Sequence, residues 1–161
     1  MKLAGHSCPT VAGAYLMALE GLKILYKNGS LPKRGEIKVI FSKNSLDDTT
    51  GVVANVFTQI TGATETYGFK GIQNRFARHS LMSFGQDIKS DIRLQRVDNG
   101  NFVDIYYNPS VIFVEDEQKE LMPKMIKNIA SKDEKERFGQ LWQDRVHNIF
   151  KHRHKVIKID Q

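Results

Sequence analysis

Apolar residues recur every three or four positions near the start of the chain, which is the period of a helix buried along one face. The pattern predicts a helix from Pro9 to about Lys27, because proline is favoured at the first helical position. Asn28 and Gly29 are residue types that commonly follow a helix terminus. The expected buried stripe consists of Val11, Ala14, Tyr15, Ala18, Leu22 and Leu25.

Short stretches of alternating apolar and polar residues predict β-strands with one buried face. One strand is expected over residues 36–41. Its buried side is expected to carry Ile37, Val39 and Phe41. Residues 91–97 and 101–107 flank Asp98-Asn99-Gly100, and Asn-Gly readily adopts the positive φ angles of a tight turn. These two stretches therefore predict an antiparallel hairpin.

A second helix is expected to carry the apolar residues Val52, Val53, Val56, Phe57 and Ile60. Asp47-Asp48-Thr49-Thr50 precedes it, and Asp or Thr at such a point caps a helix N-terminus. Thr61-Gly62 is expected to close this helix, and the glycine-rich residues 62–71 predict a loop. Residues 76–84 are compatible with strand or helix, and we favour a strand.

The last third of the chain reads as helical after a short extended piece at residues 111–114. One helix is expected from Glu117 to Ala130, with Pro123 in its first turn or at a kink. Residues 131–134, Ser-Lys-Asp-Glu, fit a capping box. The long helix that follows is expected to bury Phe138, Leu141, Trp142, Ile149 and Phe150.

Together these elements predict an α+β fold, with a mixed or antiparallel sheet, N-terminal helices packed on it and a long C-terminal helix. We expect the main domain to cover residues 1–114. Residues 115–161 are expected to form a helical extension packed on the same domain.

Composition narrows the possible settings of the protein. One cysteine among 161 residues excludes an internal disulfide and fits a reducing compartment. No apolar run is long enough to span a bilayer and no secretory leader is recognisable, so we expect a cytoplasmic protein without membrane contact. The net charge is +6, with much of the excess at residues 151–158.

We interpret this basic end as a solvated tail and expect no nucleic-acid partner, because no nucleic-acid-binding motif accompanies it. The same interpretation covers the histidines near it, since a helix C-terminus favours cations. These histidines are His147, His152 and His154.

The candidate chemistry lies at His6 and Cys8. If the first helix begins at Pro9, Cys8 is its N-cap, where free N–H groups and the helix dipole favour a thiolate. His6 offers an imidazole that can share a metal or pair with the thiolate. The alternative is that Cys8 is a small buried hydrophobic residue and His6 an ordinary hydrogen-bonded one. Residues 12–14, Ala-Gly-Ala, make the first turn slim, so another backbone is expected to approach it.

Other polar residues are weaker candidates. Asp47 and Asp48 are possible oxygen ligands to a metal shared with His6 and Cys8, although N-capping explains them more simply. Lys70 lies between Phe69 and Gly71, a setting in which a lysine can meet an anionic ligand, although most loop lysines are simply solvated.

The motif Gly5-His6-Ser7-Cys8-Pro9, followed by a helix that contains Tyr15, resembles the FmdE-like family of formylmethanofuran dehydrogenase subunits and their stand-alone relatives. The resemblance continues in residues 60–63 and 68–71 and covers roughly residues 4–110. It implies an α+β domain, a homodimer and a metal site, with zinc as the expected ion, around His6 and Cys8. The family commonly has cysteines where this chain has residues 49–52 and Ala63. Any role of those cysteines therefore does not carry over, and a stand-alone bacterial relative is favoured over a protein of methanogenesis.

Three hypotheses follow. In the first, His6 and Cys8 bind a metal. The protein is then either a metal-dependent enzyme or a metal-binding protein without catalytic activity. Lys70, Arg75 and His79 then line the same cleft and hold a small anionic ligand. In the second, the chain is a non-enzymatic subunit or binding module that recognises a partner through the hairpin and the long basic helix. In the third, His6 acts as base to a metal-free Cys8 nucleophile.

Overall fold

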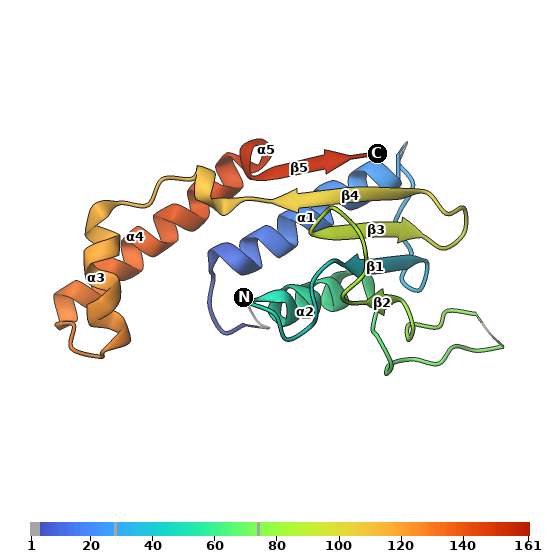
Figure 1. The fold of residues 1–161 in the computed structure, drawn as a ribbon, viewed down its shortest axis with the longest axis horizontal. Coiled ribbons are helices and arrows are strands. Elements are labelled where there is room, and N and C mark those ends of the chain that lie inside the picture. The colour runs from blue at the N-terminus through green and yellow to red at the C-terminus, as the bar shows by residue number, and fades with distance from the viewer. Residues whose placement is uncertain (1–3, 28, 74) are drawn as a thin grey trace.

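The computed structural model describes residues 4–27, 29–73 and 75–161, and Figure 1 shows their arrangement. The helices are α1 (Pro9–Leu25), α2 (Thr50–Thr61), α3 (Asp116–Ile126), α4 (Lys132–Lys151) and α5 (Arg153–Val156), with a 3-10 turn η1 (Pro109–Val111). The strands are β1 (Ile37–Phe41), β2 (Met82–Ser83), β3 (Ile92–Arg96), β4 (Phe102–Tyr107) and β5 (Ile157–Asp160). The predicted α+β class is confirmed.

The strands form one mixed sheet in the order β2-β1-β3-β4-β5. β1 and β2 are parallel, whereas every other neighbouring pair is antiparallel. The predicted hairpin is β3 and β4, in which Leu94 lies opposite Val103. Because Leu94 and Val103 are both fully buried, this register turns the apolar side of the hairpin toward α1.

Helix α1 packs across the sheet, and α2 lies beside it. At Gly21 an added Cβ would lie 2.5 Å from Ile105 Cδ1 and 2.9 Å from Leu94 Cδ1, so glycine lets the helix approach the strands closely. The expected stripe was correct for Ala14, Ala18, Leu22 and Leu25. It was wrong for Tyr15, which is 46% exposed, while Leu16 and Met17 are buried. α1 contacts the sheet, α2 and α4 at once, and this rotates and widens its buried face.

The C-terminal third extends and then returns. α3 and the first half of α4 (residues 116–141, here called the arm) project away from the sheet and the helices α1 and α2 (here called the body). The arm lies at the left of Figure 1. The rest of α4 comes back over α1, and β5 adds an edge strand to β4, with Ile159 opposite Ile105. The predicted solvated tail is therefore wrong for Val156 and Ile157, which are buried, although the charged residues around them are exposed. The final residues belong to the sheet.

Several local expectations need correction. Only Met82–Ser83 of the expected strand 76–84 pairs with β1, because most of that segment is an irregular loop. The expected extended piece at 111–114 is preceded by the turn η1, which Pro109 begins. α3 ends at Ile126 rather than at Ala130, and Pro123 lies in its second half rather than in its first turn.

Helix termini were predicted more successfully. α1 begins at Pro9 and ends at Leu25, where the Tyr26 N–H donates to Leu22 O. The part of the expected stop signal at Asn28 lies outside the described residues. Ser131 forms the expected capping box before α4, since its backbone N–H donates to Glu134 Oε2 at 2.8 Å and its hydroxyl accepts from the Glu134 N–H at 3.2 Å.

Candidate functional site

Cys8 is the N-cap of α1, as the position of Pro9 predicts. Its backbone is extended (φ −146°, ψ 165°), and its Sγ accepts a long hydrogen bond from the Val11 N–H at 3.5 Å. The residue is only 8% exposed. The sulfur therefore occupies the position that an oxygen of Ser or Asp usually takes at a helix N-terminus, where the free N–H groups favour negative charge.

His6 is exposed, and its Nδ1 lies 2.8 Å from Ala4 O. A carbonyl oxygen can only accept, so Nδ1 carries the proton in this arrangement and Nε2 keeps its lone pair. Metal-binding histidines are commonly oriented in this way, with the other ring nitrogen donating to a backbone carbonyl. His6 therefore offers the lone pair of Nε2, two positions in sequence before a cysteine that offers one sulfur.

Two aromatic side chains from distant parts of the chain fix the position of residues 6–9, here called the corner. Trp142 of α4 donates from Nε1 to Ser7 O at 2.8 Å, and Tyr107 of β4 donates from its hydroxyl to Pro9 O at 2.7 Å. These two carbonyls flank Cys8 on either side. The position of Cys8 is therefore set by the packing of α1 against both the sheet and α4.

The Tyr107 ring fills the space left by the slim first turn of α1. A Cβ added at Gly13 would lie 2.2 Å from a ring carbon of Tyr107. The close approach predicted for this turn is thus made by a side chain and not by another backbone. Burial raises the pKa of Tyr107 to about 12, against the lowering effect of the nearby Arg145 charge, so the hydroxyl remains a donor at neutral pH.

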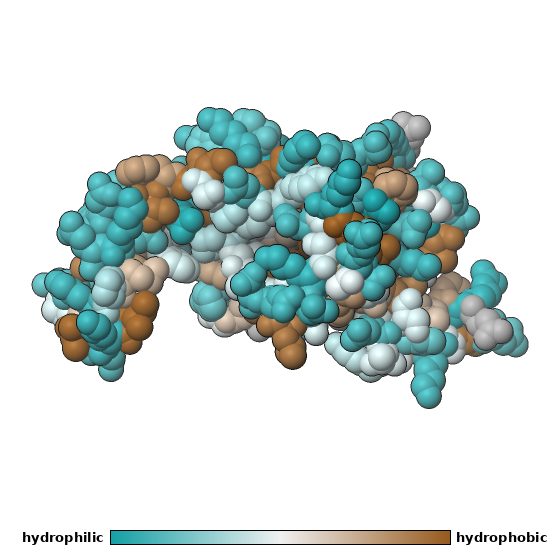
Figure 2. Space-filling view, viewed as in Figure 1, coloured by the Kyte–Doolittle hydropathy of each residue, from teal (hydrophilic) through white to brown (hydrophobic). Residues whose placement is uncertain are grey.

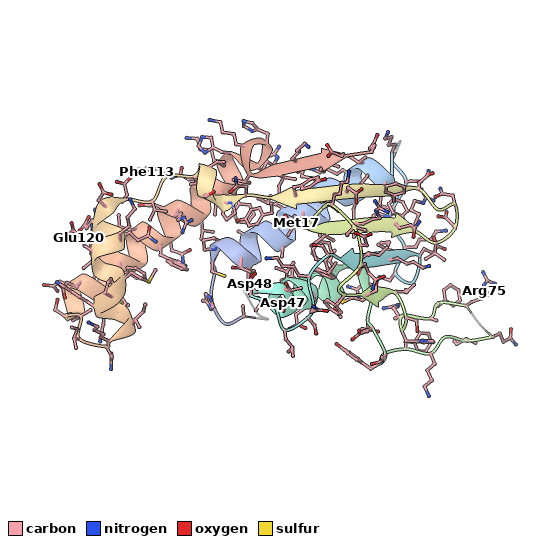
Figure 3. All side chains as sticks on the ribbon, in the orientation of Figure 1. Met17, Asp47, Asp48, Arg75, Phe113 and Glu120 are labelled. Carbon is pink, nitrogen blue, oxygen red and sulfur yellow. The ribbon has the colours of Figure 1, made fainter. Side chains whose placement is uncertain are left out.

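A cavity of about 160 Å³ lies beside the corner, between α1, the sheet and the start of α2. Its wall is lined by Met17, Phe41, Ser42, Lys43, Asp48, Thr49, Thr50, Val53, Asp91, Ile92 and Tyr107. Figure 3 labels two residues from its opposite sides, Met17 on α1 and Asp48 in the loop before α2. Since Tyr107 contacts the corner and also lines the cavity, the two features are adjacent.

Asp47 and Asp48, which precede α2, make different contacts. Asp48 lines the cavity, has a positive φ of 47° and forms an ion pair with Lys43 at 2.6 Å. The hydrogen bond from Lys43 lowers the pKa of the Asp48 carboxyl, and that carboxylate raises the pKa of Lys43. Asp47 accepts the Asn44 N–H at 2.9 Å within the same turn. N-capping by either aspartate is therefore wrong: Thr49 is the N-cap and makes no side-chain capping bond.

The other predicted cleft residues lie elsewhere. Lys70, Arg75 and His79 belong to the long loop between α2 and β2, and none of them lines the cavity. Figure 3 shows Arg75 at the end of that loop, far from Asp47 and Asp48. Lys70 is exposed, and the Nδ1 of His79 lies 3.0 Å from the Ser80 hydroxyl. The structure does not bring these three residues to the corner.

His6 and Cys8 offer two potential metal ligands at the start of α1. Over residues 4–27, 29–73 and 75–161, His, Cys, Asp and Glu side chains form no group of three or more that could hold a metal ion. A nitrogen and a sulfur donor fit zinc chemically, but they fill only half of a tetrahedral set. A metal at this position would need further ligands from outside the described residues.

Sequence reasoning did not connect Trp142 and Tyr107 with the segment around Cys8, or Lys43, Asp91 and Tyr107 with the cavity. Tyr107 was expected only as a strand residue, and no local spacing pattern connects it with Pro9, 98 positions away.

Within the described residues, no helix is both long and apolar enough to cross a membrane. A comparison with known protein families finds none that matches this chain, and a comparison with curated proteins finds no match either.

Proposed function

We propose that this chain is a metal-binding protein of the FmdE-like type, similar to that class of formylmethanofuran dehydrogenase subunits, with His6 and Cys8 binding a divalent transition metal, zinc being the expected ion. The observation that carries the proposal is the pairing of an N-cap cysteine with a histidine whose Nδ1 is committed to a backbone carbonyl. The helix N-terminus favours the thiolate that a metal needs, and the Ala4 carbonyl leaves Nε2 as the ligand atom. A metal held there would supply Lewis-acid chemistry or an activated water.

The proposal includes a homodimer, because one chain exposes more surface than a compact protein of its size. Its accessible area is 10073 Å². A monomer of this mass is expected to expose about 8,200 Å². The difference is larger than the roughly 800 Å² that each partner buries in a standard interface. Apolar side chains on and beside the arm are suited to such an interface: Val111, Phe113, Ile126 and Ile129 are 50–77% exposed.

Figure 2 shows separate brown apolar patches on the arm, at the left of the view, among teal hydrophilic residues. A second copy could also supply the ligands that a His6–Cys8 pair lacks.

The dimer is tested by sedimentation velocity of the wild-type chain and of the double variant Ile126→Asp with Ile129→Asp. Ile72→Asp, on the distant α2–β2 loop, is the control. We expect a dimer that the arm variant alone disrupts. A wild-type monomer at micromolar concentration would contradict it.

The metal itself is tested by elemental analysis of protein purified without a histidine tag and without added metal. We expect near-stoichiometric zinc in the wild type and its loss in Cys8→Ala and in His6→Ala. His154→Ala is the matched control, because His154 is an exposed histidine near the end of the chain. Circular dichroism checks that each variant is folded. Zinc retained in folded Cys8→Ala, or absent from the wild type, would refute the proposal.

The second candidate is a non-enzymatic subunit that binds a different protein. The exposed apolar residues of the arm favour it, because solvent-facing groups of this kind commonly mark an interaction surface. Isolation from the native host distinguishes the two: a stoichiometric partner of different sequence supports the second candidate. The metal-free thiol hypothesis requires a hydrogen bond between His6 and Cys8, whereas within the described residues His6 Nδ1 bonds to Ala4 O and the Cys8 sulfur accepts the Val11 N–H.

A further inference from the structure

One end of the cavity is formed by the N-terminus of α2, which lacks the usual capping groups. Thr49, the N-cap, makes no side-chain bond to the helix, and the first turn contains no acidic residue. The first N–H groups of a helix have no partner within the helix. The aligned peptide dipoles add a partial positive charge at the same place. This end of the cavity therefore attracts the negative end of a ligand.

Thr50 provides an independent sign of a ligand at this place. It is 8% exposed and lines the cavity. Within the described part of the chain, its hydroxyl makes no hydrogen bond. Another buried threonine of α2 behaves differently, because Thr61 donates from its hydroxyl to Phe57 O at 2.7 Å. Thr50 Oγ1 is not one of the fully buried polar atoms that lack a partner, so the hydroxyl keeps some accessible surface and can donate to water or to a ligand in the cavity.

Charged side chains surround the mouth of the cavity. Lys43 and Asp48 form an exposed ion pair there, and Asp91 uses Oδ2 to accept the Tyr107 N–H at 2.8 Å. Lys43 adds to the attraction of the α2 N-terminus for an anion. Asp48 and Asp91 oppose it, and Asp48 also competes with any anion for Lys43. The charge of the preferred ligand thus depends on the balance between Lys43 and the α2 N-terminus, which attract an anion, and the two aspartates, which repel it. Mutations can test each contribution separately.

The remainder of the cavity wall is apolar. Phe41 and Ile92 from the sheet, Met17 from α1 and Val53 from α2 line it. The volume of about 160 Å³ is below the roughly 300–1,000 Å³ of pockets for drug-sized ligands, so it suits a small molecule. A ligand of about six non-hydrogen atoms, with an apolar body and one charged end, matches this space in size and polarity.

We propose that the cavity binds a small organic carboxylate. The carboxylate group lies at the N-terminus of α2, where it accepts hydrogen bonds from the Thr50 hydroxyl and the N–H groups of Gly51 and Val52 and faces Lys43. The Thr50 N–H does not take part, because it already donates to Asp47 O at 3.0 Å. The alkyl part lies against Met17, Phe41 and Ile92. This binding does not require the proposed metal, so Cys8→Ala, which removes the sulfur ligand, is expected to leave it unchanged.

The proposal is tested by titrating the full-length protein with butyrate, acetate and n-butylamine, following backbone amide signals by NMR. Butyrate is expected to shift the signals of Thr50 and Gly51 in a saturable way. It should bind about tenfold more tightly than acetate, because it buries two more methylene groups. Butylamine has a similar size and the opposite charge, and it is expected not to bind. Butylamine binding as tightly as butyrate, or no saturable binding of butyrate, would overturn the proposal.

Variants of the charged and hydroxyl groups sharpen the test. Thr50→Val is expected to weaken butyrate about tenfold, the effect of losing one hydrogen bond to a charged group. Thr66→Val, on the exposed loop after α2, is the matched control. Lys43→Met, at an exposed position that should not affect folding, is also expected to weaken butyrate. Asp48→Asn is expected to strengthen it, because Lys43 loses its competing partner. Weaker butyrate binding in Asp48→Asn, or unchanged binding in Lys43→Met, would count against the carboxylate.

Discussion

The body of the molecule and its arm are held together by different forces. In the body, α1 is packed on the sheet, and residues such as Ala18, Leu94 and Ile105 are fully buried. The arm has few buried side chains and relies on ion pairs such as Arg137–Glu117, whose side chains are nearly half exposed. Burial of apolar surface stabilises a fold strongly, whereas exposed ion pairs contribute little. The arm is therefore expected to be less stable than the body within one chain, and the proposed dimer would add contacts to it.

The largest expected effect is on the body. Ile105→Ala removes a fully buried side chain of β4 and should reduce the free energy of unfolding by about 2–5 kcal/mol. Leu121→Ala, the corresponding truncation in the arm, should reduce it less and mainly increase hydrogen exchange in α3. Urea unfolding and amide exchange measure the two effects. Equal losses of global stability would show that arm and body unfold as one unit.

The next effect concerns the contact that fixes the corner. Gly13→Ala should destabilise the protein by about 1–3 kcal/mol, because the new methyl group collides with the Tyr107 ring. In a Tyr107→Ala background the same change should be neutral or stabilising, since alanine is the better helix former. A double-mutant cycle measured by thermal unfolding therefore isolates the Gly13–Tyr107 contact. Additive effects would mean that the ring does not occupy this space.

The smallest expected effects compare an ion pair of the body with one of the arm. Hydrogen bonds from Arg93 lower the pKa of Asp104, which is largely buried and also accepts the Ser90 hydroxyl. A lowered native-state pKa gives stability that is present above the unfolded value, near 4, and is lost as the pH falls through the native-state value. Asp104→Asn should therefore reduce the acid dependence of unfolding. Glu117→Gln, in the pair of the arm whose side chains are nearly half exposed, should change stability at pH 7 only slightly, because solvent screens the pair. Urea unfolding from pH 7 to pH 2 measures both, and a larger effect for Glu117→Gln would invert the comparison.

The sequence predicted elements whose causes are local. Pro9 fixed the start of α1 and the N-cap position of Cys8, the Ser131–Glu134 box fixed the start of α4, and Asn99-Gly100 fixed the hairpin. Another local signal lies at positions 157–160, where apolar and polar residues alternate, and this segment is β5. The alternation indicates a strand, but the basic residues before it led to the interpretation of this end as a solvated tail.

The candidate site divides in the same way. The residue types of His6 and Cys8 and their position at a helix N-terminus follow from neighbouring residues alone. The cavity does not, because its walls come from α1, the sheet and the start of α2. Asp47 and Asp48 are adjacent in sequence, yet only Asp48 lines it, since turn geometry directs the two side chains differently. The separation of Arg75 from the corner likewise depends on the path of a long loop.

The sequence by itself thus determined the helix and strand starts, the α+β class and the thiol at the start of α1, because hydrogen bonds and periodicities within a few residues decide them. Only the tertiary structure decided what surrounds that thiol. The bonds from Tyr107 to Pro9 and from Trp142 to Ser7 join residues 98 and 135 positions apart. Such contacts form only when helices and sheet are packed, since the gain in burial of the whole core, and no local preference, brings these side chains together.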